Sequence, residues 1–543
     1  MTAPSVEHYL AVRARMETPL PARYNVAADI CDRWADEPGR VALVVPRGRD
    51  EPPLEVTYGD LAERSSRLAN VLEATGVARG DRVAVCLPQS LECAIVHLAI
   101  QRLGAVAVPL AAMAGPDALR HRVVDSGARV GVADGSTHGW LLDDAVLSAT
   151  RWLFYGSTEW DDALALARPH RASADTTLED PAVLMYTSGT SGQAKGALHA
   201  QRVVPSHVEP ISLAHDLYPL DADVMWSPTD WAWTGGLVNC LFIGLRSGRP
   251  LVVWRPRGFD ADEVLAHLEH HGVTASFLPP TALKLLREAT GVEDRARRLA
   301  LRTVMTGGER CGEAVIDWCR AVLGLTPNEV YGQTEASAIV GNSGTLFPVK
   351  PGSVGLEYPR ARAAVLDDDG NELPAGELGE IAFHGSTAAM FLGYWNGVDG
   401  PIPVGAWQRT GDLGRRDEDG YLWHEGRRDD VILSAGYRIG PGEVEECLAR
   451  HPAVRAVAVV GEPDELRGQI VTAVLELYDG ERPREELERE LAASVRDRLA
   501  PYEVPRRFHV VDALPRTDTG KIRRAELRRL LQIPTDSPTQ EVP

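Results

Sequence analysis

The chain has 543 residues, of which 44% are hydrophobic and 25% charged, a composition typical of globular proteins. This length exceeds what one hydrophobic core supports, so we expect two or more domains. The formal net charge of −20 disfavours binding to nucleic acid or to anionic membranes, because both need a basic surface. It leaves open an anionic small molecule held at a locally positive site.

The seven cysteines are an odd number, scattered and without a CxxC pair, which predicts reduced and mostly buried thiols. No segment approaches the roughly 20 consecutive apolar residues of a membrane span, and the N-terminus lacks the apolar run of a signal peptide. We therefore expect a cytoplasmic protein with no membrane anchor.

The first half alternates strand and helix patterns. Residues 82–88 predict a buried strand, 90–104 a helix that begins after Ser90 and stops at Gly104, and 105–110 the next strand. This βαβ order predicts a parallel sheet. The pattern recurs in a last set of segments: strand 251–254, helix 260–272, strand 273–278, strand 301–306 and a strand ending at 330–331.

The loops that follow two of these strands are candidate site loops. Ligands of open α/β sheets bind at the carboxyl ends of the strands. Strand 301–306 runs directly into Gly307 and Gly308, and the later strand ends at Tyr331. We therefore expect the segments beginning at 307 and 331 to contact a ligand.

The second half has a different composition. After about residue 350, turn signals at 367–379 and 417–420 separate short strands and predict a small β-rich subdomain. Beyond 430 the pattern is compact α+β, with a domain boundary expected near 427–430 and a loose polar tail at 533–543. Its elements are helix 441–451, strands 454–460 and 470–477, and helix 482–499, followed by the apolar segment 508–514.

The segment YTSGTSGQAKGAL (186–198) carries the strongest chemical signal. It follows an apolar strand, is dense in Gly, Ser and Thr, and includes Lys195, one of only four lysines among the 57 basic residues. Backbone N–H groups, hydroxyls and an ammonium suit a polyphosphate. Lys195 is followed by Gly rather than Ser or Thr, which disfavours a Walker A loop. The alternative is an ordinary flexible surface loop.

Two further segments hold candidate ligand contacts. In YGQTEA (331–336), Tyr331 can stack on a base, Thr334 can donate to phosphate and Glu335 can bind Mg²⁺. In the segment 410–445, Asp412 can accept from a ribose diol, and Arg427 can reach the same ribose or a phosphate. Taken singly, the first segment is an ordinary turn and the two charges are ordinary surface charges.

The segment RTDTGKIRR (516–524) contains a lysine in a chain that otherwise uses arginine. Lysine supplies a compact single charge on a flexible stem, which the planar fork of arginine does not. Lys521 is therefore a candidate for a specific contact, whereas Lys284 and Lys350 match no motif.

In this order and spacing, TSGTSGQAKG, YGQTE, TGD, GRRDDVILSAGYRIG and PRTDTGK resemble the signature motifs of the adenylate-forming (AMP-binding) superfamily, over roughly residues 55–530. YRIGPGEVE is most similar to the medium-chain and acetate-type acyl-CoA synthetases. The resemblance implies an α/β fold: a large N-terminal domain (1–426) of two parallel-type layered sheets with a small β-barrel-like subdomain, a hinge (427–430) and a small mobile α+β domain (431–532).

The resemblance also implies two half-reactions. A carboxylic acid and ATP give acyl-AMP and pyrophosphate, and the acyl group then passes to CoA with release of AMP. ATP, Mg²⁺ and CoA are thus the expected cofactor and co-substrates. The protein mainly positions reactants and neutralises charge.

The roles of matching residues follow from the same resemblance. Lys521 matches the catalytic lysine, which bridges the carboxylate and the α-phosphate, Thr334 an α-phosphate ligand, and Glu335 the Mg²⁺ ligand, assisted by Thr190. Asp412 and Arg427 match ribose contacts, and Asp429 the hinge. Gly436 and Arg438 match positions beside the CoA and phosphates. The remaining nucleotide contacts are Thr187, Ser188, Gly189, Thr190, Ser191, Gly192, Lys195, Gly308, Glu309, Arg310, Tyr331, Gly332 and Gln333.

The acyl pocket is expected to include Trp231, Trp233, Gly235, Gly307 and Gly332. The resemblance implies that acetate-specific relatives carry a tryptophan at the position that matches Gly332. A glycine there is expected to leave space for a larger acid. The two tryptophans favour a medium-sized, bulky apolar or ring-bearing acid. The alternative interpretation places both tryptophans in the core.

Three other functions remain open. One is a free-standing adenylation enzyme that loads the thiol of an acyl carrier protein. Another is a member competent in only one half-reaction. The last is a non-catalytic scaffold, which the presence of Lys521, Glu335 and the Gly-rich loop disfavours.

Overall fold

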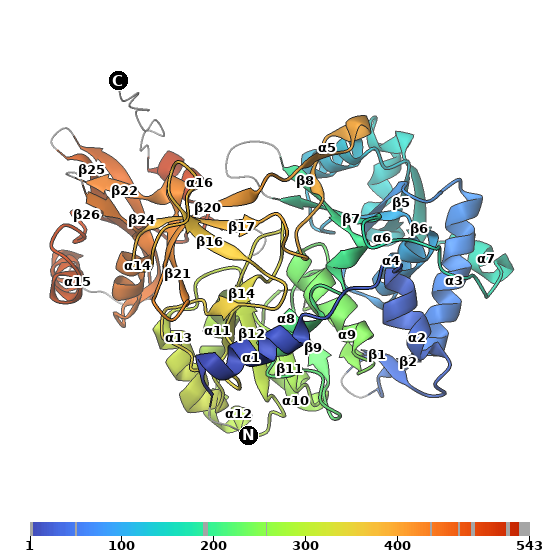
Figure 1. Cartoon of the computed structure of the whole chain (residues 1–543), viewed down its shortest axis with the longest axis horizontal. Helices are drawn as coiled ribbons and strands as arrows, with labels where there is room; N and C mark the ends of the chain where they lie inside the picture. Colours follow the sequence, from blue (N-terminus) through green and yellow to red (C-terminus); the bar gives the residue numbers. More distant parts are fainter. Residues whose placement is uncertain are drawn as a thin grey trace. The chain divides into compact units, whose positions relative to one another are not determined.

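The computed structural model describes residues 4–48, 51–187, 194–256, 258–434, 437–464, 467–478, 484–516 and 522–531. Internal contacts divide the chain into two compact units (Figure 1). The first comprises residues 1–363 and 383–408, and the second 364–382 and 409–543. The small sheet thus groups with the C-terminal part, and a boundary at 427–430 stays a prediction.

One sheet of the first unit has the described strand order β19-β18-β8-β7-β4-β3-β5-β6. Its centre, β7-β4-β3-β5-β6, is parallel, whereas β8, β18 and β19 add antiparallel pairs. The strands are β3 (Arg82–Cys86), β4 (Val106–Pro109), β5 (Val130–Asp134), β6 (Arg151–Tyr155), β7 (Pro181–Thr187), β8 (Lys195–Ala200), β18 (Gly393–Trp395) and β19 (Pro401–Pro403).

The other sheet of this unit has the described order β15-β14-β13-β12-β11-β9-β10-β1-β2. The strands from β13 to β1 are parallel, so their carboxyl ends share one edge. The strands are β1 (Val41–Val45), β2 (Leu54–Thr57), β9 (Met225–Trp226), β10 (Leu251–Val252), β11 (Ala275–Phe277), β12 (Thr303–Gly307), β13 (Asn328–Tyr331), β14 (Val340–Gly341) and β15 (Leu356–Glu357).

The remaining strands form two further sheets, one in the order β16-β17-β20-β21 and the other in the order β23-β22-β25-β24 with β26 paired to β25. The first is the β-rich part expected after residue 350, and the second belongs to the expected α+β part. The strands are β16 (Ala363–Leu366), β17 (Gly379–His384), β20 (Trp407–Arg416), β21 (Leu422–Arg427), β22 (Ile432–Ser434), β23 (Tyr437–Ile439), β24 (Val454–Asp464), β25 (Gly468–Leu477) and β26 (Arg507–Val510).

Local sequence signals explain the first predicted βαβ unit. The side chain of Ser90 accepts a hydrogen bond from the backbone N–H of Cys93 and caps helix α4 (Leu91–Leu103). Gly104 ends the helix in the left-handed conformation, with φ of 68°. Strands β3 and β4 on either side of the helix pair in parallel, as predicted.

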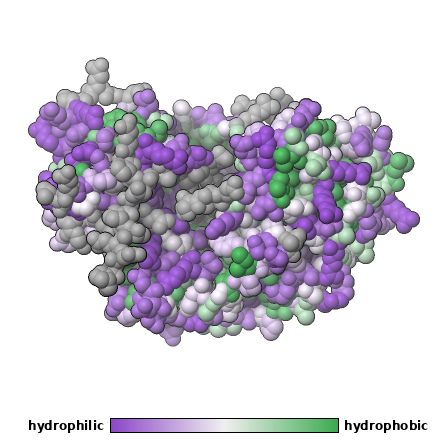
Figure 2. All heavy atoms as spheres, turned by 90° about the horizontal axis from the view of Figure 1, so that it is seen from above, coloured by the Kyte–Doolittle hydropathy of each residue, from purple (hydrophilic) through white to green (hydrophobic). Residues whose placement is uncertain are grey.

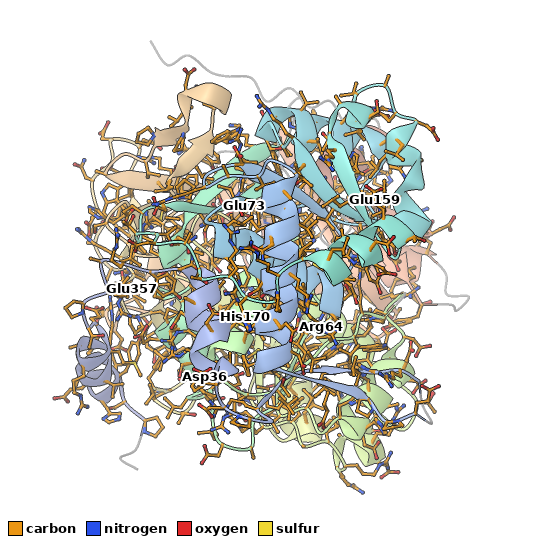
Figure 3. The ribbon with its side chains drawn as sticks, turned by 90° about the vertical axis from the view of Figure 1, so that its right-hand side faces the viewer. Asp36, Arg64, Glu73, Glu159, His170 and Glu357 are labelled. Atoms are coloured by element: carbon orange, nitrogen blue, oxygen red, sulfur yellow. The ribbon has the colours of Figure 1, made fainter. Side chains whose placement is uncertain are left out.

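Other helices cover the sheets of the first unit. Helix α3 (Tyr58–Ala74) begins with a capping box between Thr57 and Asp60 and packs beside α4 (Figure 1). The chain crosses its C-terminal end, where Arg171 forms two hydrogen bonds with Glu73, the residue labelled on that helix in Figure 3. The longer helices that follow are α5 (Pro116–Ser126), α7 (Thr158–Leu166), α10 (Ala261–His270) and α11 (Pro280–Arg287).

In the second unit, α14 (Pro441–Ala449), α15 (Arg484–Arg498) and α16 (Arg524–Leu530) pack on the sheet of β24 and β25. One face of this sheet contributes Val459, Val471 and Leu475 to a core with Leu448 and Leu491. The opposite face packs on α16 through Val460, Val474 and Leu527. Both faces of the sheet are therefore covered, which explains its nearly continuous apolar sequence.

The surface is mainly hydrophilic on the face shown in Figure 2, with apolar side chains in small scattered groups. All seven cysteines are buried and free of disulfides, as expected. Among the described residues, none of the helices is both long and apolar enough to cross a bilayer.

Candidate active site

The stem of the expected phosphate loop is an antiparallel hairpin. Thr187 at the end of β7 faces Lys195 at the start of β8, and its hydroxyl donates to the Lys195 carbonyl over 3.4 Å. The hairpin brings the two ends of the Gly-rich segment together. Its central residues Ser188, Gly189, Thr190, Ser191 and Gly192 lie outside the described residues.

Two further candidate loops follow the neighbouring strands β12 and β13 of the other sheet and leave its edge side by side. Gly307 at the end of β12 pairs with Val330 of the parallel strand β13. A Cβ on Gly307 would lie 2.6 Å from the Val330 carbonyl oxygen, so the close approach of β13 requires glycine here. Gly308 has a φ of 87°, which also favours glycine. The loops at 307 and 331 are therefore neighbours, as predicted.

Glu309 is held within its loop by the neighbouring helix. The hydroxyl of Thr281 on α11 lies 2.9 Å and 3.1 Å from its two carboxylate oxygens. Arg310 follows directly in the chain. The ring of Tyr331, half-buried at the end of β13, lies 5.8 Å from the ring of Phe383 in a tilted arrangement.

The turn after Tyr331 corrects one expectation. A Cβ on Gly332 would lie 1.3 Å from the Ser337 carbonyl oxygen. The expectation that Gly332 leaves open space for the acid is therefore wrong on the side where its Cβ would lie. The turn closes on itself because the Ser337 N–H donates to the Gln333 carbonyl over 2.6 Å, with Ser337 at a φ of 54°. Gly332 is therefore needed for the backbone and gives no evidence of a larger acyl pocket.

Glu335 is buried and contacts a residue that none of the motifs contains. The hydroxyl of Tyr394 on β18 donates to Glu335 Oε1 over 2.6 Å. Lys195 Nζ lies 5.5 Å from the centroid of the same tyrosine ring, within the range of a cation–π contact. Burial and the Glu335 charge raise the pKa of Tyr394, so it remains a hydrogen-bond donor. Tyr394 thus joins the candidate phosphate lysine to the candidate metal ligand.

Thr334 is half-buried, and its backbone is fixed by a buried histidine. His199 Nε2 donates to the Thr334 carbonyl over 2.8 Å. Burial lowers the pKa of His199 to about 3, so the ring is neutral and carries its proton on Nε2. Because β8 carries both Lys195 and His199, this strand places one residue at the phosphate loop and another beneath the turn at 334.

The expected acyl pocket contains residues of two kinds. Trp231 is fully buried, as in the alternative interpretation, whereas Trp233 is half-buried. A Cβ on Gly235 would lie 2.7 Å from Phe277 Cε1, so this glycine allows the ring of β11 to approach the backbone. Asp230 pairs with Arg255 at 3.0 Å, while burial raises the pKa of its carboxyl.

The candidate ribose residues lie in the second unit and form one cluster. Asp412 on β20 faces Arg427 on β21, and Arg427 Nη1 donates to Asp412 Oδ1 over 3.0 Å. The same Nη1 lies 3.0 Å from the Thr410 carbonyl oxygen. Gly411 has a φ of 74°, and a Cβ there would lie 2.8 Å from Arg427 Nη2. The TGD motif therefore makes room for the guanidinium.

The expected hinge is flanked by anchored charges. Arg428 pairs with Glu380 at 3.1 Å and Asp368 at 2.9 Å, while Asp430 pairs with Arg528 at 3.1 Å. The side chains of Asp429 and Arg438 are outside the described residues, and so are the whole of Gly436 and Lys521. The expected roles of these four residues stay predictions.

The chain matches the AMP-binding enzyme family over residues 31–395 and the C-terminal domain of AMP-binding enzymes over residues 443–521. It therefore belongs to the AMP-binding enzyme family. It is 33% identical over 517 residues to the uncharacterized acyl-CoA ligase YtcI of Bacillus subtilis (strain 168), with 94% of this chain and 96% of that protein covered.

Two further comparisons agree. The chain is 34% identical over 544 residues to mitochondrial acyl-coenzyme A synthetase ACSM4 of Rattus norvegicus, covering 95% of this chain and 92% of that one. The crystal structure of ATP-bound MatB from Rhodopseudomonas palustris superposes with a TM-score of 0.83 at 27% identity, covering 94% and 99% of the chains. The predicted family, fold and ligase class are confirmed.

Sequence reasoning missed Tyr394 and His199. Neither belongs to a quoted signature core, and both act through contacts with residues far away in the chain. The one local signal was the position of Tyr394 in the apolar segment MFLGYW (390–395), which reads as an ordinary strand.

Proposed function

We propose that this protein is an ATP-dependent acyl-CoA synthetase that converts a carboxylic acid and ATP to acyl-AMP and pyrophosphate, then transfers the acyl group to CoA and releases AMP. The observation that carries the proposal is the grouping of Lys195, Glu335 and Thr334 around β8 and β18. A cation and a carboxylate joined through Tyr394, with a threonine next to the carboxylate in the chain, suit a metal-bound polyphosphate.

The donor set around Glu335 fits Mg²⁺. Within the described residues, only Oε1 of this carboxylate accepts a protein hydrogen bond, and hard cations prefer carboxylate oxygens. We infer that Glu335, assisted by Thr190, would hold the ion, which neutralises phosphate charge when bound. Lys195 and residues 187–192 would bind the phosphates, with Gly308 to Arg310, Gly332 and Gln333 lining the nucleotide.

The other roles follow from the family motifs. We propose that Tyr331 stacks on adenine, that Asp412 and Arg427 bind the ribose, and that Lys521 contacts the carboxylate and α-phosphate during adenylation. Asp429 would act as the hinge between the half-reactions, with Gly436 and Arg438 near CoA. The pairing of Asp412 with Arg427 supports a shared ribose site, because it orients the carboxylate.

We further propose a medium-sized or ring-bearing acid. The support is the half-buried indole of Trp233 and the Phe277 ring at Gly235, since aromatic side chains commonly line apolar ligand sites.

A pyrophosphate-release screen tests both levels of the proposal. Acetate, butyrate, octanoate and benzoate would each be supplied with ATP and Mg²⁺, with CoA, an acyl carrier protein or neither acceptor. We expect acid-dependent pyrophosphate release and acyl-CoA formation, strongest with octanoate or benzoate. A preference for acetate would exclude the larger acid, and thioester formation only on the carrier protein would favour a carrier-loading enzyme.

A further inference from the structure

Strand β18 and the residues before it hold both the backbone and the side chain of Glu335. The Phe391 N–H donates to the Glu335 carbonyl oxygen over 2.8 Å, and the Tyr394 hydroxyl donates to Glu335 Oε1 over 2.6 Å. Strand β18 in turn pairs with β8, where Tyr394 lies opposite Ala197. The segment around Glu335 and the segment leading into β18, which are far apart in sequence, are thereby fixed to each other at the candidate metal ligand.

The hydroxyl of Tyr394 has a specific effect on this carboxylate. Since a carboxylate at neutral pH only accepts hydrogen bonds, the phenol must be the donor. Within the described part of the chain no other side chain donates to Glu335, so among those residues this is the side-chain hydrogen bond that orients the buried carboxylate. It occupies Oε1 and leaves Oε2 without a protein donor among those residues.

We propose that Tyr394 is a positioning residue that orients Glu335 for divalent-cation binding. The inference rests on the proposed function, in which Glu335 binds Mg²⁺. Hydrogen-bonded partners of ligating carboxylates set the orientation of the ligand and thereby the affinity for the metal. With Oε1 held by the phenol, the carboxylate loses little rotational freedom when a cation binds, because the protein has already restricted it.

The ring of Tyr394 has a separate effect, through Lys195. The ammonium 5.5 Å from the ring centroid is attracted by the π-face, which any aromatic ring provides. Tyr394→Phe removes the hydroxyl and keeps the ring, whereas Tyr394→Leu removes both. The first variant therefore tests the carboxylate contact alone, and the second adds the loss of the lysine contact.

The direct test is Mn²⁺ binding to the full chain with a non-hydrolysable ATP analogue, followed by electron paramagnetic resonance. We expect Tyr394→Phe to weaken Mn²⁺ binding by about 10-fold, the lower end of the effect of losing such a partner. The Mg²⁺ concentration for half-maximal pyrophosphate release should rise similarly, with kcat at saturating Mg²⁺ near that of the wild type. Tyr394→Leu should in addition raise the KM for ATP at saturating Mg²⁺.

Tyr24→Phe is the matched control. Tyr24 donates to the Asp29 carboxylate over 2.7 Å, so the variant removes the same kind of bond outside the candidate site. Its metal dependence should equal that of the wild type. Tyr394→Gln supplies an amide donor without a ring and should bind Mn²⁺ more tightly than Tyr394→Leu. Thermal unfolding of each variant shows that the fold is retained.

The outcomes distinguish a failure of the Tyr394 positioning role from a failure of the proposed metal-binding role of Glu335. If Glu335→Gln abolishes Mn²⁺ binding while Tyr394→Phe binds Mn²⁺ like Tyr24→Phe, the positioning role of Tyr394 is wrong. The metal-binding role of Glu335 then stands. Equal Mn²⁺ affinities of the Gln and Leu variants at 394 would also contradict the positioning role. If Glu335→Gln binds Mn²⁺ like the wild type, the proposed role of Glu335 itself fails.

Discussion

Arg524 forms two hydrogen bonds with Glu445, in which Nη2 lies 2.7 Å and 2.9 Å from the two carboxylate oxygens. Arg524 also pairs with Asp430 at 3.5 Å, and the charges of both carboxylates raise the pKa of the guanidinium against the effect of burial. The arginine at the start of α16 is thus tied to helix α14 and to the residue after the expected hinge position. It begins the helix three residues beyond Lys521.

We expect Arg524→Ala to lower the free energy of unfolding of the second unit by about 2 kcal/mol, because among the described residues it leaves the largely buried Glu445 carboxylate without a charged partner, whereas Asp430 keeps its pairing with Arg528. Urea unfolding of the full chain measures this. The control is Arg523→Ala, since Arg523 is exposed and, among the described residues, its ion pair is with Glu526 one turn away, a contact worth about 0.5 kcal/mol or less. Equal destabilisation by both variants would show that the buried cluster is not what stabilises α16.

Gly332→Ala should disrupt the turn that carries Thr334 and Glu335. A Cβ at this position would lie 1.3 Å from the Ser337 carbonyl oxygen, so the backbone must move, at a cost of about 3 kcal/mol. We expect lower thermal stability and loss of pyrophosphate release with every acid. Gly312→Ala is the control, since a Cβ there meets no atom within 4 Å and its φ is −63°. A variant at 332 that keeps its stability and only prefers shorter acids would restore the pocket interpretation.

Lys521→Ala should suppress acyl-AMP formation by at least about 100-fold, the size of effect expected when a group that stabilises transition-state charge is removed. Thioester formation from supplied acyl-AMP should be nearly unchanged, because the α-phosphate bond to the acyl group already exists. Single-turnover assays of each half-reaction measure the difference. Lys284→Ala, which removes a lysine that matches no motif, is the control. Equal loss in both half-reactions would contradict the assigned role.

Asp429→Pro should affect the second half-reaction more than the first. Proline fixes φ near −65° and so restricts rotation of the backbone at the position between the anchored residues Arg428 and Asp430. The same half-reaction assays apply, with Asp429→Ala as a control that removes the side chain but keeps the backbone free. A larger loss in adenylation than in thioester formation would place the hinge elsewhere.

Features that depend on residues close together in the sequence were predicted better than features that depend on contacts between distant segments. Helix α4 follows from Ser90 and Gly104, because a capping side chain and a left-handed glycine act within a few residues. The end of a strand at Tyr331 was likewise predicted from the sequence pattern, whereas the roles of residues 331–335 rest on the family resemblance. The link from Tyr394 to Glu335 was not predicted, because it depends on how β18 pairs with β8. Gly332 was misinterpreted, since its neighbour in space is a backbone carbonyl that no pattern of residue types reveals.

Stability should fall in acid because of buried histidines such as His97 on α4. Burial lowers the pKa of His97 to about 3, and neither ring nitrogen has a hydrogen-bond partner among the described residues. The unfolded chain has the ordinary histidine pKa of about 6.5, so below that pH it binds a proton that the folded protein excludes. The free energy of unfolding should therefore decrease as the pH falls from 6.5 towards 3, by about 2 kcal/mol for this group between pH 7 and pH 5.

His97→Leu and His97→Gln both remove this proton, although only glutamine leaves a buried polar group. Urea unfolding between pH 5 and pH 7.5 should show the same weaker pH dependence in the two variants, with the glutamine variant less stable at every pH. His199, His215 and His267 have their pKa values lowered to about 3 by burial in the same way, so part of the acid sensitivity should remain. A pH dependence identical to that of the wild type would mean that His97 takes up its proton in the folded protein as readily as in the unfolded chain.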